Sequence, residues 1–168
     1  MRLPIIISAT LLLSLGLNLP AMSETTAEKG QCQRQTNKNL NFRRLRFNSR
    51  LWDQANISNY RITVSNSCFC ILDARGPVVI EVRNGRTASI TSVATGKPIN
   101  PQFFEKYNTI PKLFDVIQDA INRKAYSLDV RYNAKLGYPT QINIDYDSQI
   151  ADEEIYLTIE NFQEIKTR

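Results

Sequence analysis

The residues of this chain whose type and spacing could support chemistry are its three cysteines, which can form disulfides or a redox pair. Cys68 and Cys70 flank a single residue, Phe69, whereas Cys32 stands well ahead of them. Where disulfides persist, an odd number of cysteines leaves one thiol unpaired or paired between molecules. One arrangement is a disulfide from Cys32 to Cys68 or Cys70, which would fasten the N-terminal segment to the fold. The other is a redox couple between Cys68 and Cys70.

Histidine-dependent catalytic chemistry is excluded because the chain contains no histidine. Ser-His-Asp catalysis, Cys-His catalysis and histidine-ligated zinc all require that residue. Three sulfurs alone make a poor complete shell for a thiolate-bound metal. The six glycines do not cluster into a phosphate-binding loop. We therefore predict no cofactor, no catalytic residue and no enzymatic activity.

The acidic run from Asp145 to Glu154 gathers the hard oxygen ligands that calcium prefers. The weak candidate ligands are Asp145, Asp147, Asp152 and Glu153. The run lacks the glycine that a calcium-binding loop has at its sixth position, and Tyr156 stands where the twelfth position needs a bidentate acid. We predict no metal site and interpret the run as a solvated loop whose charge opposes aggregation of sheet edges.

Charge is distributed unevenly along the chain, which has a formal net charge of +5. The segment Lys29–Arg50 carries basic residues and no acid, and Asp145–Glu164 carries acidic residues and no base. Such segments attract each other within a fold or steer a charged partner. Arg43, Arg46 and Arg50 recur at helical spacing, so they form either a solvated helix face or a docking surface for an acidic partner.

Aromatic and turn residues complete the predicted interaction surface. They are Trp52 and the turn Gly137-Tyr138-Pro139. Large aromatic side chains are favoured at interfaces, although packing inside the protein explains tyrosines such as Tyr138 equally well. The Asn84-Gly85 turn is a second loop that a partner could contact, and one face of the sheet is the alternative binding surface.

The N-terminus predicts an exported protein. Residues 1–23 combine Arg2, an apolar run and a small-residue site at Ser23, which is typical of a cleaved signal peptide. An uncleaved membrane anchor is the alternative, but the apolar run is short and contains Gly16. After cleavage we expect no membrane span and a location in the periplasm or outside the cell. Export and the mixed charges argue against nucleic-acid binding.

Residues 24–40 are polar and without period, so we interpret them as a flexible polar and basic arm. Residues 41–168 then form a single α+β domain. Apolar periodicity predicts helices over Asn41–Ala55 and Thr109–Lys124. The strand signals are Tyr60–Leu72, Pro77–Arg83, Arg86–Ala94, Tyr126–Asn133, Ile142–Tyr146 and Ile155–Ile159. In the first of these, an uninterrupted register places Cys68 and Cys70 on the buried face.

The order of these elements predicts an antiparallel sheet with two helices covering one face. A unit of one helix followed by a three-stranded meander occurs twice, over residues 41–95 and 108–163. In an alignment of the two units, the Tyr60 strand matches the Tyr126 strand. We interpret this as a tandem repeat. The matching residues are few and apolar, so chance similarity between two such units is the alternative.

Short motifs run from Leu51 to Phe162. They are Trp52, Asn59-Tyr60, Cys68-Phe69-Cys70, the Pro77 strand ending in Val82-Arg83-Asn84-Gly85, Thr95-Gly96, Thr109-Ile110, Leu113-Phe114, Tyr132, Leu136-Gly137-Tyr138-Pro139 and Asp152-Glu153-Glu154. With these motifs the chain resembles the bacterial family called domain of unknown function 6174 (DUF6174). The resemblance implies an exported or envelope-attached protein without an assigned function. The architecture is also similar to the β-lactamase inhibitory proteins and to small PepSY-like, peptidase-inhibitor-like modules, a likeness of fold that does not fix function.

We therefore expect an exported, non-catalytic binding or inhibitor-like module of the bacterial envelope, whose partner is a protein or another envelope component. The alternative is a thiol-redox or disulfide-dependent envelope factor that uses Cys68-Phe69-Cys70. Calcium tuning at the acidic run would be a third, structural role. The sequence does not predict the oligomeric state.

Overall fold

The computed structural model describes residues 26–68, 70–150 and 153–166, and of residues 26–36 it describes the backbone only. The helices are α1 (Thr26–Ala55), α2 (Leu72–Arg75) and α3 (Ile110–Arg123), with a 3-10 turn, η1 (Pro101–Phe104). The strands are β1 (Tyr60–Asn66), β2 (Val78–Arg83), β3 (Arg86–Ser92), β4 (Ser127–Tyr132), β5 (Pro139–Asp145) and β6 (Ile155–Glu164). The predicted signal peptide lies outside the described residues.

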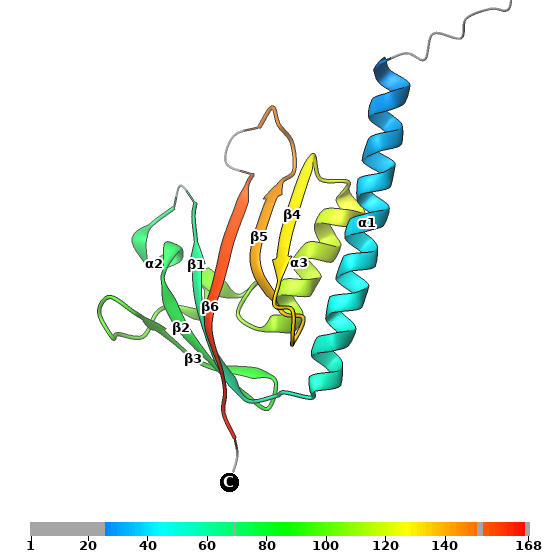
Figure 1. Ribbon diagram of the computed structural model, residues 1–168. Coiled ribbons are helices and arrows are strands. Elements are labelled where there is room, and N and C mark those ends of the chain that lie inside the picture. Colours follow the sequence, from blue (N-terminus) through cyan, green and yellow to red (C-terminus); the bar gives the residue numbers. More distant parts are fainter. Residues whose placement is uncertain (1–25, 69, 151–152, 167–168) are drawn as a thin grey trace, which may run out of the picture.

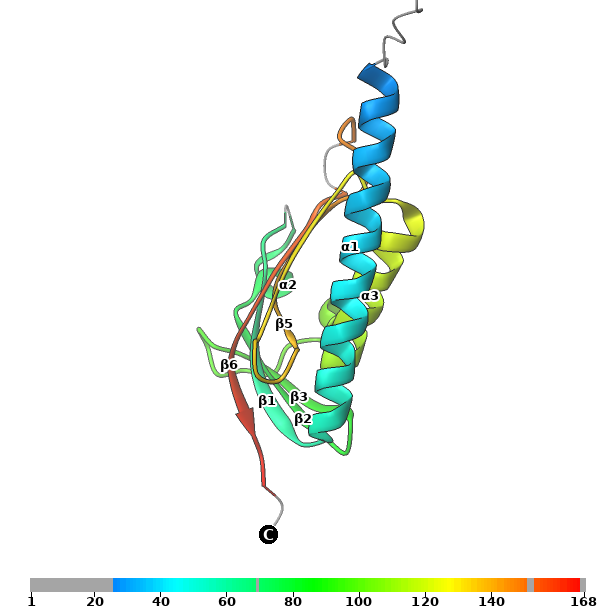
Figure 2. The same cartoon turned by 45° about the vertical axis from the view of Figure 1, so that its right-hand side comes forward.

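The strands form one antiparallel sheet in the order β3-β2-β1-β6-β5-β4. Two meanders, β1–β3 and β4–β6, meet where β1 pairs with β6 at the centre of the sheet. Both α1 and α3 lie on the same side of this sheet, and no helix covers the other side within the described chain (Figures 1 and 2). The predicted α+β class is confirmed.

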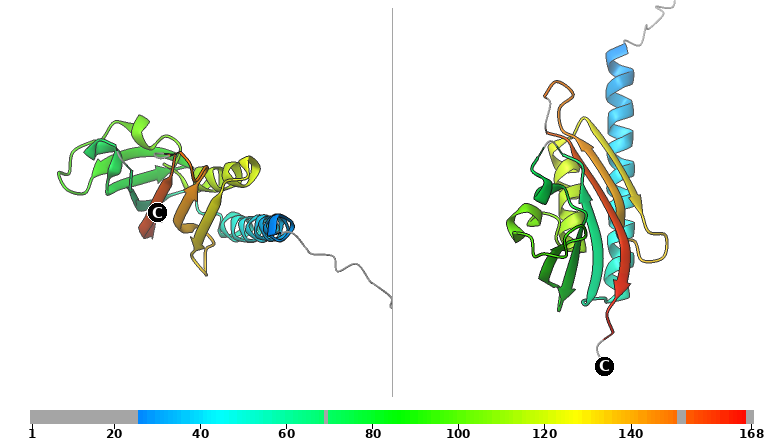
Figure 3. Two further views of the ribbon diagram at one scale, coloured as in Figure 1. Left: turned by 90° about the horizontal axis from the view of Figure 1, so that it is seen from above. Right: turned by 90° about the vertical axis from the view of Figure 1, so that its left-hand side faces the viewer.

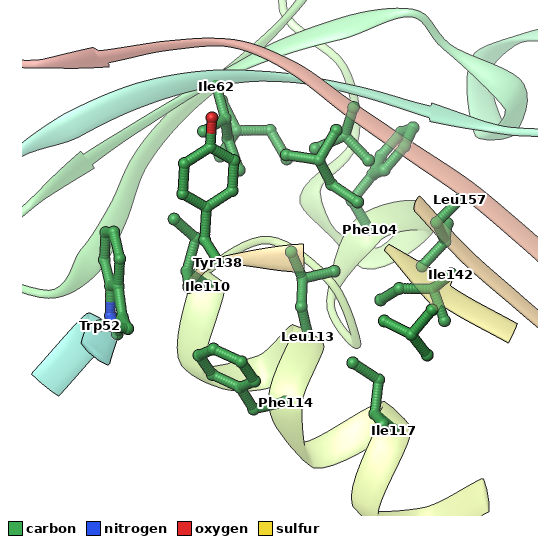
Figure 4. Packing of buried hydrophobic residues seen from close by; sticks show 14 of the residues in the cluster. Trp52, Ile62, Phe104, Ile110, Leu113, Phe114, Ile117, Tyr138, Ile142 and Leu157 are labelled. Carbon is green, nitrogen blue, oxygen red and sulfur yellow. The ribbon is translucent and has the colours of Figure 1, made fainter. Parts of the chain in front are cut away.

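The core lies between α3 and the inner face of the sheet. The α3 stripe places Leu113 and Ile117 against the strands, where both are fully buried. Alternate positions of the central strands supply the opposite wall, including Ile62, Ile142 and Leu157, none of them exposed (Figure 4). The apolar residues that recur every second position in the strands and about every 3.6 positions in α3 therefore pack together in one layer.

The ends of α3 match the sequence prediction closely. Thr109 caps the N-terminus by accepting a hydrogen bond from the Lys112 N–H, and Lys124 ends the helix in the left-handed conformation. In addition, the Tyr60 hydroxyl oxygen accepts a hydrogen bond from the Ile110 N–H at 2.8 Å. That bond joins β1 to one of the backbone donors that the first turn of a helix leaves unpaired.

The structure differs from the sequence prediction at two boundaries. Helix α1 begins at Thr26 instead of Asn41, so the predicted arm is helical from Thr26 onward. No proline interrupts this segment, and most of its residues are good helix formers. The helix therefore extends from its packed part back to Thr26 at little cost in free energy. Strand β1 ends at Asn66 instead of Leu72, because its pairing with β2 stops at Val64, opposite Val78, and its pairing with β6 stops at Asn66, opposite Leu157.

The proposed tandem repeat stays a prediction. The element order is as expected, but β1 lies at the centre of the sheet whereas β4, its counterpart in the second unit, lies at the edge. The aligned tyrosines show the consequence, since Tyr60 is 1% exposed and Tyr126 is 58% exposed. Equivalent sequence positions therefore occupy different environments. The likeness to β-lactamase inhibitory proteins and PepSY-like modules likewise remains unconfirmed.

Candidate functional sites: the disulfide loop and the outer face of α1

The cysteine pair lies in the loop between β1 and α2. Cys68 and Cys70 form a disulfide, with their Cα atoms 5.3 Å apart. The expectation that an uninterrupted strand buries both sulfurs is wrong, because β1 ends two residues before Cys68 and both cysteines are half-buried. Phe69, between them, lies outside the described residues.

The predicted disulfide from Cys32 to Cys68 or Cys70 is also wrong, because those two cysteines are bonded to each other. Cys32 lies in the N-terminal half of α1, and its side chain is outside the described part of the chain. That half of α1 runs along the opposite edge of the molecule from the loop between β1 and α2 (Figure 1).

The surroundings of the disulfide are apolar and open to solvent. Ile71 is 60% exposed and Leu72 is 79% exposed, immediately after Cys70. The Arg75 side chain donates a hydrogen bond from Nε to the Cys70 carbonyl oxygen at 2.8 Å, which holds the end of the loop against α2. A partner can therefore reach this loop without unfolding the sheet.

A second candidate surface is the α1 outer face, which we define as Phe42, Arg43, Arg46, Phe47 and Arg50. The spacing places these residues on one side of the helix. All three arginines are exposed, and Phe42 and Phe47 are 39% and 63% exposed. The Arg46 guanidinium lies 5.7 Å from the centre of the Phe42 ring. Within the described chain, none of the three guanidiniums forms an ion pair.

The opposite side of α1 is fixed to the protein. Leu45 and Trp52 are about as buried as core residues, at 4% and 5% exposure. The Arg44 side chain donates to the Val130 carbonyl oxygen at 2.7 Å, and the Asn41 amide donates to the Leu128 carbonyl oxygen at 3.3 Å. Both acceptors belong to β4, an edge strand whose open carbonyls would otherwise invite pairing with another chain.

Trp52 and Tyr138 do not belong to an exposed interaction surface. Trp52 packs edge-on against Tyr60, Tyr138 and Phe162, with ring centres 5.4, 6.3 and 5.8 Å away. Tyr138 is only 7% exposed and stacks on Phe162 at 4.9 Å. Figure 4 shows both residues within the buried cluster. Their burial makes them structural residues, because the turn folds back onto α1 instead of projecting into solvent.

Gly137 and Pro139 are likewise buried. Gly137 adopts φ 77°, and a Cβ placed there would collide with the Asn48 carbonyl oxygen of α1. The turn therefore needs glycine both for its backbone conformation and for its close approach to the helix. Residues 137–139 serve to dock the β4–β5 turn onto α1.

The acidic run does not form a cluster of metal ligands in the part that the structure describes, which excludes Asp152. Asp147 is exposed, and its carboxylate accepts a hydrogen bond from the Gln149 N–H at 3.0 Å, as turn residues commonly do. The Oδ1 atom of Asp145 is buried without a hydrogen-bond partner among the described atoms. Glu153 is exposed.

Figure 3 (right) shows the sheet in front of α1. On the face that no helix covers within the described chain, polar residues lie opposite one another on neighbouring strands, such as Arg61 opposite Glu81 and Gln141 opposite Thr158. Its most ordered group is Glu81, whose carboxylate accepts hydrogen bonds from Arg61 at 2.7 Å and from Arg83 at 2.8 Å. These two bonds lower the pKa of Glu81 below its usual value. Arg61 and Arg83 of this face are thus paired, whereas within the described residues Arg43, Arg46 and Arg50 of the α1 outer face form no ion pair.

These features define a class of protein: a small α+β domain with one open sheet face, a disulfide loop and an exposed basic helix. The chain belongs to the family described as a family of unknown function (DUF6174), whose model matches residues 44–164, more than two-thirds of its length. The resemblance seen in the motifs is confirmed. The match includes Arg46, Arg50 and both bonded cysteines, but it begins after Arg43 and Cys32. No curated protein and no solved structure matches the chain. No helix within the described ranges is long and apolar enough to cross a membrane.

Proposed function

We propose that this chain is an exported, non-catalytic binding module of the bacterial envelope, and that its α1 outer face binds an acidic protein partner. One observation carries the proposal: three exposed guanidiniums, which form no ion pair with the described residues, lie beside two exposed phenylalanines on a single helix face. Arginine and aromatic residues are the types enriched in protein interfaces.

Contacts on the opposite side of α1 hold the helix in a fixed position, which supports this role. Arg44 and Asn41 bind β4, and Trp52 is packed in the aromatic cluster. A surface that is already ordered loses little conformational entropy when a partner binds. The α1 outer face is therefore pre-organised for recognition.

Export rests on the N-terminal sequence and is supported by the Cys68–Cys70 disulfide, since disulfides persist in oxidising compartments. The non-catalytic character rests on the absence from the sequence of histidine-dependent catalytic sets and of a phosphate-binding glycine loop.

The test is capture of partners from envelope extract by immobilised protein lacking residues 1–23. Wild type is compared with R43Q/R46Q/R50Q and with a control that loses the same charge elsewhere, R86Q/K97Q/R131Q. We expect saturable capture of an acidic protein that weakens with salt, is retained by the control and is reduced about tenfold or more by the outer-face variant. Equal capture by both variants, or binding to anionic lipid vesicles in place of a protein, would contradict the proposal.

A second candidate function uses the disulfide loop, because the Cys68–Cys70 bond lies in an accessible loop beside exposed Ile71 and Leu72. In that role, a thiolate of a protein dithiol attacks one sulfur and forms a mixed disulfide. The partner's second thiol then attacks its own sulfur in the mixed disulfide and displaces the cysteine of this chain as a thiolate. The partner dithiol is oxidised to a disulfide, and Cys68 and Cys70 are reduced to two thiols.

Mixing the folded protein with a reduced thioredoxin-type dithiol and trapping free thiols by alkylation tests this redox role. Labelling of both Cys68 and Cys70 within minutes supports it. The absence of labelling over hours, in a protein whose loop is cut readily by protease, removes it.

A further inference from the structure

A groove lies between the two long helices, away from the α1 outer face. Its walls are residues 37–41 of α1 and the C-terminal turn of α3, and its floor is the segment that leads into β4. Its volume is about 810 Å³, within the range of sites that take small organic ligands. Figure 1 shows α1 running past the C-terminal end of α3 and the start of β4.

The groove is apolar at its base. Ala120 and Ile121 of α3 are 1% and 5% exposed, and Leu128 of β4 is half-buried beside them. Exposed apolar surface continues to the rim, where Leu40 is 52% exposed. The Asn41–Leu128 hydrogen bond ties α1 to β4 at the groove and fixes the distance between its walls.

All the formal charge on the lining residues is positive. Lys38 lies on the α1 wall and Lys124 on the α3 wall, and no aspartate or glutamate lines the groove. Neither ammonium group forms an ion pair within the described part of the chain. The adjacent helix end does not require them, because the Ala120 and Ile121 carbonyl oxygens accept hydrogen bonds from the Ala125 and Lys124 N–H groups.

From this combination we propose that the groove binds a single-chain anionic amphiphile, of the fatty-acid type. The chain of the ligand lies on Ala120, Ile121 and Leu128, and the carboxylate lies between Lys38 and Lys124. The lysine stems add apolar surface along the walls while their charged ends remain in water. The site shares no residue with the α1 outer face or the disulfide loop, so it is an additional binding function.

The test measures binding of palmitate to the protein lacking residues 1–23, by isothermal titration below the critical micelle concentration. Hexadecanol, which has the same chain without the charge, is the comparison ligand. We expect saturable binding of palmitate at one site, and binding of hexadecanol that is weaker by about fivefold to tenfold, as expected for two partly exposed ion pairs.

Two variants assign the site. K38Q/K124Q removes the groove cations, whereas K97Q/K106Q removes two exposed lysines that do not line it. We expect the first variant to bind palmitate as weakly as wild type binds hexadecanol, and the second to bind palmitate like wild type. Equal palmitate affinity of both variants, equal affinity of wild type for palmitate and hexadecanol, or the absence of saturable binding would overturn the proposal.

Discussion

At the scale of single residues, Tyr60 joins the sheet to α3. Its ring is 1% exposed and packs on Trp52, and its hydroxyl oxygen accepts the Ile110 N–H. Burial raises the pKa of Tyr60 to about 12, although the hydrogen bond from Ile110 acts in the opposite direction. The hydroxyl therefore stays neutral in the folded protein well above the pH at which a free tyrosine ionises.

Tyr60→Phe keeps the ring and removes the acceptor, which leaves a buried N–H unpaired. We expect the free energy of unfolding to fall by about 1–3 kcal/mol in urea denaturation at pH 7. Tyr156→Phe is the matched control, since Tyr156 is 45% exposed, and should change stability by less than about 0.5 kcal/mol. Equal stability of Tyr60→Phe and wild type would show that the bond contributes nothing.

Alkaline pH should destabilise the fold through the same group. The pKa of Tyr60 is raised from 10.0 to about 12 on folding, so its contribution is complete below pH 10 and is lost as the pH rises towards 12. The loss for this one residue is at most about 3 kcal/mol. Urea midpoints measured at intervals from pH 9 to 12 should fall, and Tyr60→Phe should show a shallower decline. A flat wild-type profile would contradict this.

Gly137 explains why the β4–β5 turn can lie against α1. Gly137→Ala introduces a Cβ that meets the Asn48 carbonyl oxygen while the backbone stays at φ 77°. We expect the free energy of unfolding to fall by about 2 kcal/mol or more. Gly96→Ala has a similar φ of 67° but open space around it, so it should lose only about 1 kcal/mol. Equal effects of the two substitutions in thermal and urea denaturation would mean that close packing on α1 is unimportant.

At the scale of elements, α1 protects an edge of the sheet. The Arg44 side chain donates to the Val130 carbonyl oxygen and lies 5.7 Å from the centre of the Tyr132 ring. Burial raises the pKa of Tyr132 to about 12, and the nearby Arg44 charge partly opposes that rise. Arg44 therefore stabilises the fold, whereas its neighbours Arg43 and Arg46 face outward.

Arg44→Met should separate these roles. It keeps an apolar stem of similar reach but leaves the Val130 carbonyl oxygen open, so we expect about 1–2 kcal/mol lower stability and more self-association through β4. Arg43→Met is the control and should leave stability within about 0.5 kcal/mol of wild type. Urea denaturation and sedimentation velocity measure the two effects. A stable, monomeric Arg44→Met protein would remove the proposed edge protection.

Elements with strong local signals were predictable from the sequence. The α3 stripe and its bounds near Thr109 and Lys124 agree with the structure because the apolar period and the residues at the helix ends are local signals. The beginning of α1 was not predictable, because residues 26–40 have no apolar period and their helix extends from a packed neighbour. The long-range bond from Arg44 to Val130 and the burial of Tyr138 also depend on tertiary packing, so their local sequence gave no sign of them.

The disulfide loop shows the same limit. The strand prediction was correct up to Asn66, but continuing it to Cys68 and Cys70 assumed pairing that neither β2, which ends opposite Val64, nor β6, whose pairing ends opposite Asn66, supplies. The arginines of the α1 outer face, by contrast, could be assigned to one helix face from spacing alone. What spacing could not show was that the opposite face of α1 is fixed to β4.

At the scale of the whole molecule, two surfaces compete for the role of the main binding site. Within the described residues, the arginines of the α1 outer face form no ion pair and lie beside exposed phenylalanines, whereas Glu81 on the open sheet face is paired with both Arg61 and Arg83. An antiparallel sheet can leave one face in water without binding anything there. This contrast is the reason for assigning the partner to α1.

Site-specific photo-crosslinking in living cells tests that assignment most directly. A photoreactive amino acid replaces Phe47, 63% exposed on the α1 outer face, or Tyr156, 45% exposed on β6. The account predicts a discrete crosslink to an acidic protein from position 47, its loss when R43Q/R46Q/R50Q is added, and no such product from position 156. A protein crosslink from position 156 alone, or one from position 47 that survives removal of the three arginines, would contradict it.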